Sequence, residues 1–170
     1  MEIQIRNPKK TRKISLRRLK QTALKALQEL KGSENWQLSV ILVGDEDIRK
    51  LNKTYRYVEE STDVLSFPLH ETVAPGSFKE KPDPLVPFLL GDVVISVDTA
   101  ERQARARMHS LGDEVDILLV HGILHLVGYD HEREEDAKQM MAAEARILKS
   151  KEGLIQKTSK RFIQNGPEAR

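Results

Sequence analysis

Residues 111–131 read LGDEVDILLVHGILHLVGYDH, an apolar helical segment that leads into three histidines with the spacing His-x3-His-x5-His. His121 and His125 are four residues apart, so a helix places them on one face. Gly128 allows the chain to turn, because glycine adopts positive φ without steric cost. The turn lets His131 come back toward the other two imidazoles. Three imidazoles without a fourth protein ligand form the open tetrahedral site of a catalytic zinc, with one position left for water.

The spacing also matches the HExxHxxGxxH pattern of the metzincin peptidases, including the glycine at Gly128. One position differs. Gly122 stands where those peptidases carry the glutamate that acts as general base. The segment therefore predicts a metzincin-like metal site that lacks the adjacent peptidase base.

The remaining sequence predicts one α+β domain over residues 1–170, a small mixed four-stranded sheet packed with about five helices. Residues 71–88 contain four prolines and predict a long loop, and the residues after Gly153 predict a frayed tail. Asp98 and Asp113 are the predicted caps of the third and fourth helices. The predicted strands are 2–6, 36–43, 62–69 and 91–97, and the predicted helices are 16–30, 48–55, 99–109, 114–126 and 134–149.

Composition limits the classes of protein. The 170 residues include no cysteine, which excludes disulfides and cysteine-ligated zinc and favours a reducing cytoplasm. We expect neither a secretory signal nor a membrane span, because no apolar run is long enough. The net charge is only +2, but eight basic residues stand against one acidic residue in the first twenty. This cluster fits either a phosphate-bearing partner or a solvated helix face.

The motif at residues 121–131 closely resembles the signature of the YbeY-type bacterial metalloproteins. Two further segments agree in the same order, LNKTYR at 51–56 followed by TDVLSFP at 62–68, and GDVVIS at 91–96. The resemblance covers roughly residues 40–148. It implies a zinc-dependent, single-strand-specific endoribonuclease that acts in maturation of 16S ribosomal RNA, notably its 3′ end, and in ribosome quality control.

The same resemblance implies the site and its partners. One zinc ion per chain would be held by His121, His125 and His131, and the catalytic residues would be Arg56 and His121. The expected partners are single-stranded ribosomal RNA and the small ribosomal subunit with its proteins, in the cytoplasm. The resemblance makes Arg56 the candidate for neutralising charge on a phosphate, since its planar guanidinium matches two phosphate oxygens. Without the resemblance, a surface arginine that packs its stem on the sheet would be the better interpretation.

Other polar and aromatic residues are candidates for supporting roles. Zinc-bound histidines usually donate their second ring N–H to a carboxylate or carbonyl, and Asp63, Asp92 and Asp130 are the candidate carboxylates. Single-stranded bases stack on aromatic rings. The aromatic content is only 5%, which favours core packing for most of the candidate rings, which are Phe67, Phe78, Phe88 and Tyr129.

Two alternatives to a nuclease stay open at this point. A zinc peptidase shares the ligand spacing, although Gly122 counts against it. A non-catalytic ribosome-assembly factor with a structural zinc would need a fourth ligand, from His70 or an aspartate, because structural zinc is normally four-coordinate. The sequence does not identify a general base, the cleavage site, the native metal or the oligomeric state.

Overall fold

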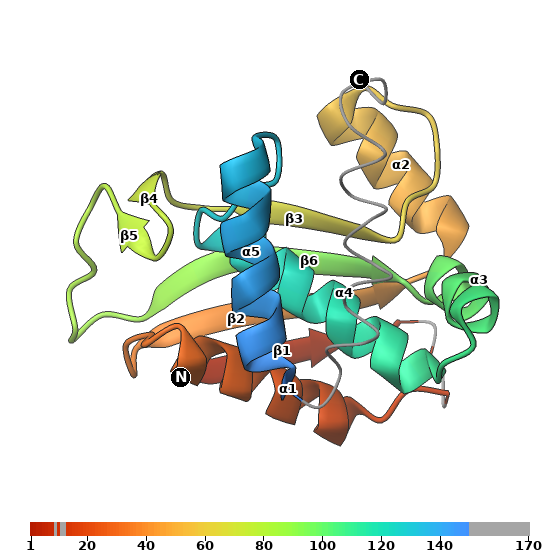
Figure 1. Ribbon diagram of the computed structural model, residues 1–170, viewed down its shortest axis with the longest axis horizontal. Coiled ribbons are helices and arrows are strands. Elements are labelled where there is room, and N and C mark those ends of the chain that lie inside the picture. The colour runs from red at the N-terminus through yellow and green to blue at the C-terminus, as the bar shows by residue number, and fades with distance from the viewer. Residues whose placement is uncertain (9, 11–12, 150–170) are drawn as a thin grey trace.

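A mixed four-stranded sheet forms the centre of the protein, for which the computed structural model describes residues 1–8, 10 and 13–149 (Figure 1). The strand order is β1-β2-β6-β3. The first three strands pair in parallel and β3 pairs antiparallel with β6 at the edge of the sheet. The strands are β1 (Glu2–Arg6), β2 (Trp36–Val43), β3 (Val64–Pro68) and β6 (Phe88–Ser96). The predicted mixed sheet is confirmed, and the predicted frayed tail lies outside the described residues.

Five helices are found among the described residues, as the sequence predicts. They are α1 (Leu16–Glu29), α2 (Asp45–Arg56), α3 (Val97–Arg107), α4 (Leu111–Leu126) and α5 (Glu134–Ile147). None of the helices in this part of the chain is long and apolar enough to cross a lipid bilayer.

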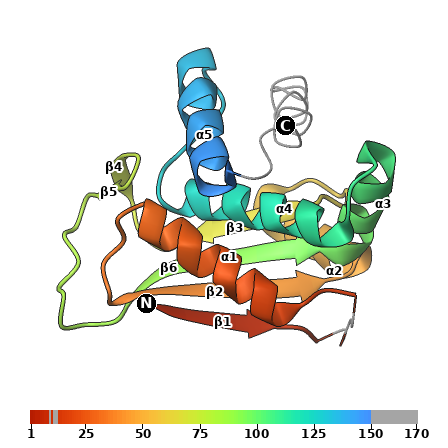
Figure 2. The ribbon, with the colours of Figure 1, turned by 60° about the horizontal axis from the view of Figure 1, so that its bottom comes forward.

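Helix α4 is the central helix of the core. Its residues from Glu114 to Leu124 are all buried, and a helix buried on every side must be surrounded by other elements. Helices α1 and α4 lie on one face of the sheet, and α5 lies outside α4 (Figure 2). Of the two histidines on α4, His121 is buried with the helix and His125 is half-buried.

Helix α2 packs on the opposite face of the sheet. Its buried Ile48 joins Leu65, Val94 and Val43 in a small apolar cluster separate from the main core. Strand side chains alternate between faces, so Val94 points to α2 whereas Val93 points to α4. The sheet thus separates α2 from the helix that carries the histidines.

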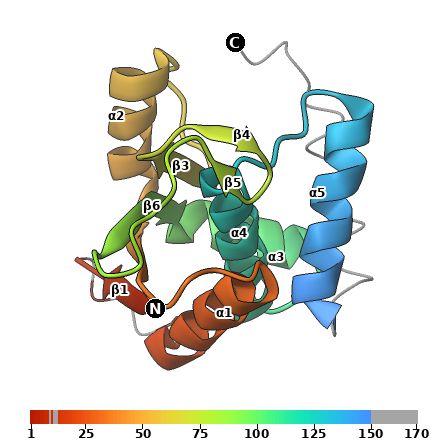
Figure 3. The same ribbon diagram turned by 90° about the vertical axis from the view of Figure 1, so that its left-hand side faces the viewer.

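The segment predicted as a long loop contains a short hairpin. Strands β4 (Thr72–Ala74) and β5 (Ser77–Phe78) pair antiparallel around Gly76, which has φ +74°. The hairpin lies at the carboxyl end of α4 (Figure 3), where Gly76 N donates to Val127 O at 2.7 Å. The prediction of a continuous loop missed it because strands this short carry little periodic signal.

Two predicted helix caps are wrong by a few residues. Ser96 caps α3 and Ser110 caps α4, instead of Asp98 and Asp113. Ser110 Oγ accepts the backbone N–H of Asp113 at 3.1 Å, and Ser96 Oγ accepts that of Thr99 at 3.2 Å. Serine and aspartate are about equally good caps, so local sequence does not choose between them.

Candidate metal centre

Helix α4 and the turn after it bring the three predicted ligands together. His121 and His125 lie on adjacent turns of α4, with ring centroids 4.6 Å apart. Gly128 has φ +90°, and the His131 ring returns to 5.6 Å from His121 and 5.1 Å from His125. A Cβ at position 128 would lie 2.4 Å from Thr72 Oγ1, so the β4–β5 hairpin also requires glycine there. The predicted turn is confirmed.

The three rings form a group that could hold a metal ion. One nitrogen from each ring lies within 4.8 Å of the others, and among the described residues this is the group that can hold a metal. His121 Nε2 and His125 Nε2 are 3.1 Å apart. Two nitrogens at zinc–ligand distances of 2.0–2.1 Å in a tetrahedron would be separated by about 3.4 Å, which is close to the separation of this pair.

Hydrogen bonds also fix the orientation of two of the three rings. His121 Nδ1 lies 2.8 Å from Glu144 Oε1, and both side chains are buried. The His125 ring forms a hydrogen bond with the backbone of Tyr129. A ring that donates its Nδ1–H to a carboxylate presents an unprotonated Nε2, the form that binds metal. These contacts aim the two α4 rings at a common point.

Sequence analysis missed Glu144, although α5 contains a signal for it. The buried positions Ala137, Met140 and Ile147 follow a helical period, and Glu144 falls on the same stripe. An acidic residue at a core position needs a partner, because an isolated buried charge is strongly unfavourable. The partner, His121, is 23 residues away, so only the packing of α5 on α4 identifies it.

The environment lowers the pKa of two of the three ligand rings, His125 and His131. Burial, followed by the neighbouring rings of His121 and His131, lowers the pKa of His125 to about 3. Burial, followed by the neighbouring ring of His121, lowers the pKa of His131. Neutral imidazole is the form that coordinates metal, so the lowered pKa values of these two rings favour metal binding.

Gly122 is required by packing. A Cβ there would lie 2.6 Å from Val93 Cγ1 on β6, and Ser66 Oγ donates to the Gly122 carbonyl at 3.0 Å. Helix α4 can approach the sheet this closely only without a side chain at position 122. The glutamate of the peptidase pattern has no room in this fold, which is evidence against the peptidase alternative.

Arg56 reaches the site from the other face of the sheet. It is the last residue of α2, and its Nη2 lies 3.5 Å from the carbonyl oxygen of Ser66 on the edge strand β3. Its positive charge contributes to lowering the pKa of His125. An exposed cation thus stands within electrostatic reach of the histidines, and its catalytic role stays a prediction.

The three candidate aspartates have different positions. Asp63 accepts hydrogen bonds from Gln103 Nε2 and Val64 N, at the start of β3. Asp130 accepts the backbone N–H of His131 at 2.7 Å and so shapes the turn that carries this ligand.

Asp92 lies on the α2 side of the sheet. It precedes Val93, which faces α4, and its carboxylate lies 3.9 Å from Arg6 Nη2. The structure does not bring Asp92 to the histidines. A carboxylate that the sequence did not indicate, that of Glu144, lies 2.8 Å from the ring of His121.

His70 and two phenylalanines belong to an aromatic cluster away from the histidines. His70 stacks on Phe88 at 3.9 Å and its Nε2 lies 2.9 Å from Leu89 O. Phe78 is buried against both rings, and Phe67 packs its ring on Tyr55. His70 is therefore occupied elsewhere and is not a fourth ligand, and these rings serve packing as the low aromatic content suggested.

Comparisons with known proteins show the family of this chain. A family model described as Endoribonuclease YbeY matches residues 4–152. Endoribonuclease YbeY of Aquifex aeolicus is 50% identical over 132 residues, which cover 76% of this chain and 78% of that protein. Endoribonuclease YbeY of Anaeromyxobacter dehalogenans is 47% identical over 139 residues, 82% of this chain but only 65% of that longer protein.

Two more distant comparisons extend the likeness. A chloroplastic Endoribonuclease YBEY of Arabidopsis thaliana is 45% identical over 72% of this chain and 19% of its own length. A solution structure of a Thermotoga maritima protein superposes with a TM-score of 0.57 at 25% identity, and covers 93% of this chain and 95% of that one.

Proposed function

The chain belongs to the Endoribonuclease YbeY family, and on that premise we propose that it hydrolyses phosphodiester bonds in single-stranded RNA with one bound zinc ion. The substrate we propose is 16S ribosomal RNA, notably its 3′ end, with a role in ribosome quality control. The small ribosomal subunit and its proteins would then be the partners, in the cytoplasm. The observation that carries the proposal is the convergence of His121, His125 and His131 on one point.

The ligand set suits this chemistry. Bound zinc supplies a Lewis acid for a phosphate oxygen and an activated water near neutral pH. Neutral imidazoles add no negative charge, so the site remains cationic toward an anionic substrate. Glu144 holds the ring of His121 and keeps its Nε2 directed into the site. Two of the three ligands, His121 and His125, lie on the buried helix α4.

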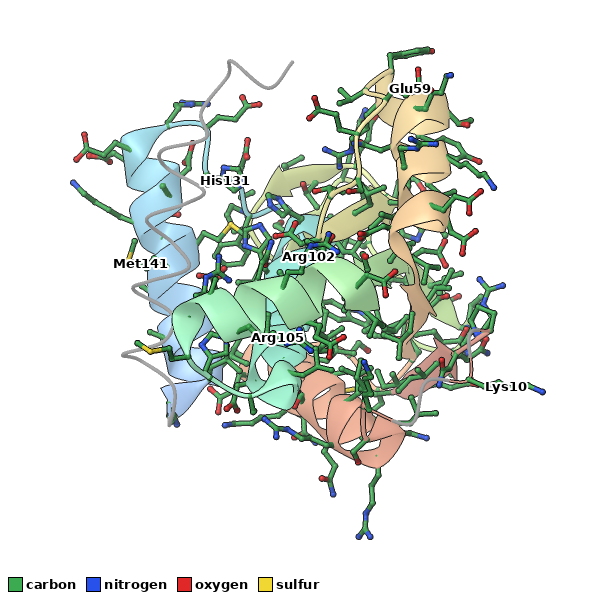
Figure 4. The ribbon with its side chains drawn as sticks, turned by 90° about the vertical axis from the view of Figure 1, so that its right-hand side faces the viewer. Lys10, Glu59, Arg102, Arg105, His131 and Met141 are labelled. Carbon is green, nitrogen blue, oxygen red and sulfur yellow. The ribbon has the colours of Figure 1, made fainter. Side chains whose placement is uncertain are left out.

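Arg56 supplies the second positive charge. Its guanidinium can hold two oxygens of the scissile phosphate and neutralise the charge that develops on them. Since Arg56 comes from α2 and the ligands from α4 and its following turn, the phosphate would bind between two separately packed elements. In Figure 4, Glu59 lies just beyond the end of α2, across from the labelled His131.

The test is cleavage of a single-stranded RNA that contains the 3′ end of 16S ribosomal RNA by zinc-loaded protein. Chelated protein and the His125→Ala variant are the controls, and a fully paired RNA of the same sequence tests the preference for single strands. We expect cutting of the single strand alone, which both controls lose. Absence of cutting by protein that holds one zinc per chain would refute the proposal and favour a non-catalytic assembly factor.

A further inference from the structure

Tyr57, the residue that ends α2, presents an aromatic ring to solvent. Its side chain is 92% exposed, and its backbone is left-handed, with φ 59° and ψ 25°. Side chains with a Cβ disfavour this conformation, which glycine adopts readily. An exposed ring on a disfavoured backbone gains nothing from the packing of the free protein. This combination directs attention to what the ring does outside the fold.

The backbone that carries this ring is well held. The N–H of Tyr57 and the N–H of Val58 both donate to the carbonyl of Asn52. The buried side chain of Asn52 in turn donates to Glu60 O at 2.9 Å. Three hydrogen bonds, each of them formed by Asn52, thus close the turn after α2. Tyr57 is presented at a constant place, so a ligand would not have to order its backbone on binding.

The neighbours of Tyr57 connect it to the metal centre. Arg56, the preceding residue, lies against the carbonyl of Ser66, whose hydroxyl donates to the carbonyl of Gly122 beside the ligand His121. An exposed aromatic ring therefore directly adjoins the cation proposed to hold the scissile phosphate.

We propose that the Tyr57 ring is a stacking platform for an unpaired base of the RNA substrate, next to the phosphate held by Arg56. The inference rests on the proposed function and names one contact that selects single strands. A base can stack on a protein ring only when its face is open, as in unpaired RNA. Stacking tolerates any base, because every base has a π face. Arg56 and Tyr57 then hold the phosphate and the base of one short stretch of strand.

Met108 provides a matched control. It ends α3 as Tyr57 ends α2, with φ 56° and ψ 44°, and its side chain is 88% exposed. Tyr57→Gly and Met108→Gly each remove an exposed side chain from a left-handed helix end. Glycine relieves the backbone at both positions, so we expect both variants to fold with a Tm no lower than that of the parent protein. Tyr57→Phe keeps the ring and removes only the hydroxyl.

The experiment measures kcat and KM for cleavage of single-stranded RNA by the zinc-loaded full chain. We expect Tyr57→Gly to raise KM about 5- to 150-fold with little change in kcat, the range that loss of one stacked base gives. Met108→Gly and Tyr57→Phe should keep the parent KM. A 2-aminopurine base in the RNA should be quenched on binding to the parent and to Tyr57→Phe, and not on binding to Tyr57→Gly.

Three results would overturn the inference: an unchanged KM for Tyr57→Gly, an equal rise for Met108→Gly, or an equal rise for Tyr57→Phe. Failure of the proposed function is distinguishable, because the parent protein would then not cut the RNA at all. In that case the stacking platform is refuted together with the nuclease.

Discussion

Two parts of the site are built in opposite ways. We call the histidine ligands with Glu144 the floor, and Arg56 with Tyr57 the rim. On the floor, His121 and Glu144 are buried, joined at 2.8 Å, and carried by α4 and α5 on one face of the sheet. At the rim, Arg56 and Tyr57 are exposed at the end of α2, which packs on the other face. If the proposed roles hold, metal retention and substrate binding depend on separate elements. Mutations should therefore separate one property from the other.

The largest effect is expected from removing a ligand on the floor. His125→Ala leaves two imidazoles, which do not hold zinc tightly, so both the metal and the cleavage activity should be lost. The measurement is zinc content per chain after purification, together with RNA cleavage. A variant that retains one zinc per chain would contradict the ligand assignment.

The next largest effect is expected from a substitution at the rim alone. Arg56→Glu should lower cleavage by about 100- to 1,000-fold or more, because a positive group that stabilises the transition state becomes a repulsive one. Zinc content should stay at one per chain. Arg49→Glu, an equal change of charge on an exposed residue of the same helix, is the control and should cut normally. Parent-level cleavage by metal-loaded Arg56→Glu would remove Arg56 from the mechanism.

A smaller effect is expected from removing Glu144, which orients the ring of the ligand His121. Glu144→Ala should weaken zinc binding by about 10- to 100-fold, because the His121 ring loses the acceptor that orients it. Glu144→Gln keeps an acceptor oxygen and should lose less. Competition with a zinc chelator gives the affinity, and nitrogen NMR shifts of His121 report its tautomer.

The control for this prediction is another glutamate on the same helix. Glu135→Ala removes an exposed carboxylate from α5 and should keep the parent affinity. Equal zinc affinity for Glu144→Ala and Glu135→Ala would show that the contact between Glu144 and His121 does not support the metal.

The smallest effect is expected in how the free energy of unfolding of the chelated, metal-free protein depends on pH. In the unfolded chain imidazoles titrate near pH 6.5, whereas the fold lowers the pKa of His125 to about 3 and also lowers that of His131. As the pH falls below about 6.5, the unfolded state binds more protons than the folded state. The free energy of unfolding should then fall by up to about 1.4 kcal/mol per pH unit for each such histidine, down to the folded pKa.

Urea unfolding of chelated protein at a series of pH values from neutral to acid measures this slope. His125→Ala removes the histidine with the largest shift and should give a shallower slope. Parallel slopes for the two proteins would contradict the lowered pKa. Above pH 7 both states carry neutral imidazoles, so these groups should add no pH dependence there.

Features set by neighbours in the chain were predictable. The strand at residues 36–43 and the helix capped by Ser15 follow the predicted limits, because their periodic apolar patterns are long. The caps at Ser96 and Ser110 and the hairpin at residues 72–78 were missed. In these places two equivalent capping residues, or a strand of two or three residues, leave the local pattern ambiguous.

The sequence by itself determined the cluster of three histidines, because the spacing of His121, His125 and Gly128 on a helix and its terminal turn is a local property of 11 residues. Only the tertiary structure decided what surrounds the ligands. Glu144 contacts His121 because α5 packs on α4. Position 122 must be glycine because α4 lies too close to Val93 for a side chain there. Such contacts join segments far apart in the chain, and no local periodicity encodes which pair will meet.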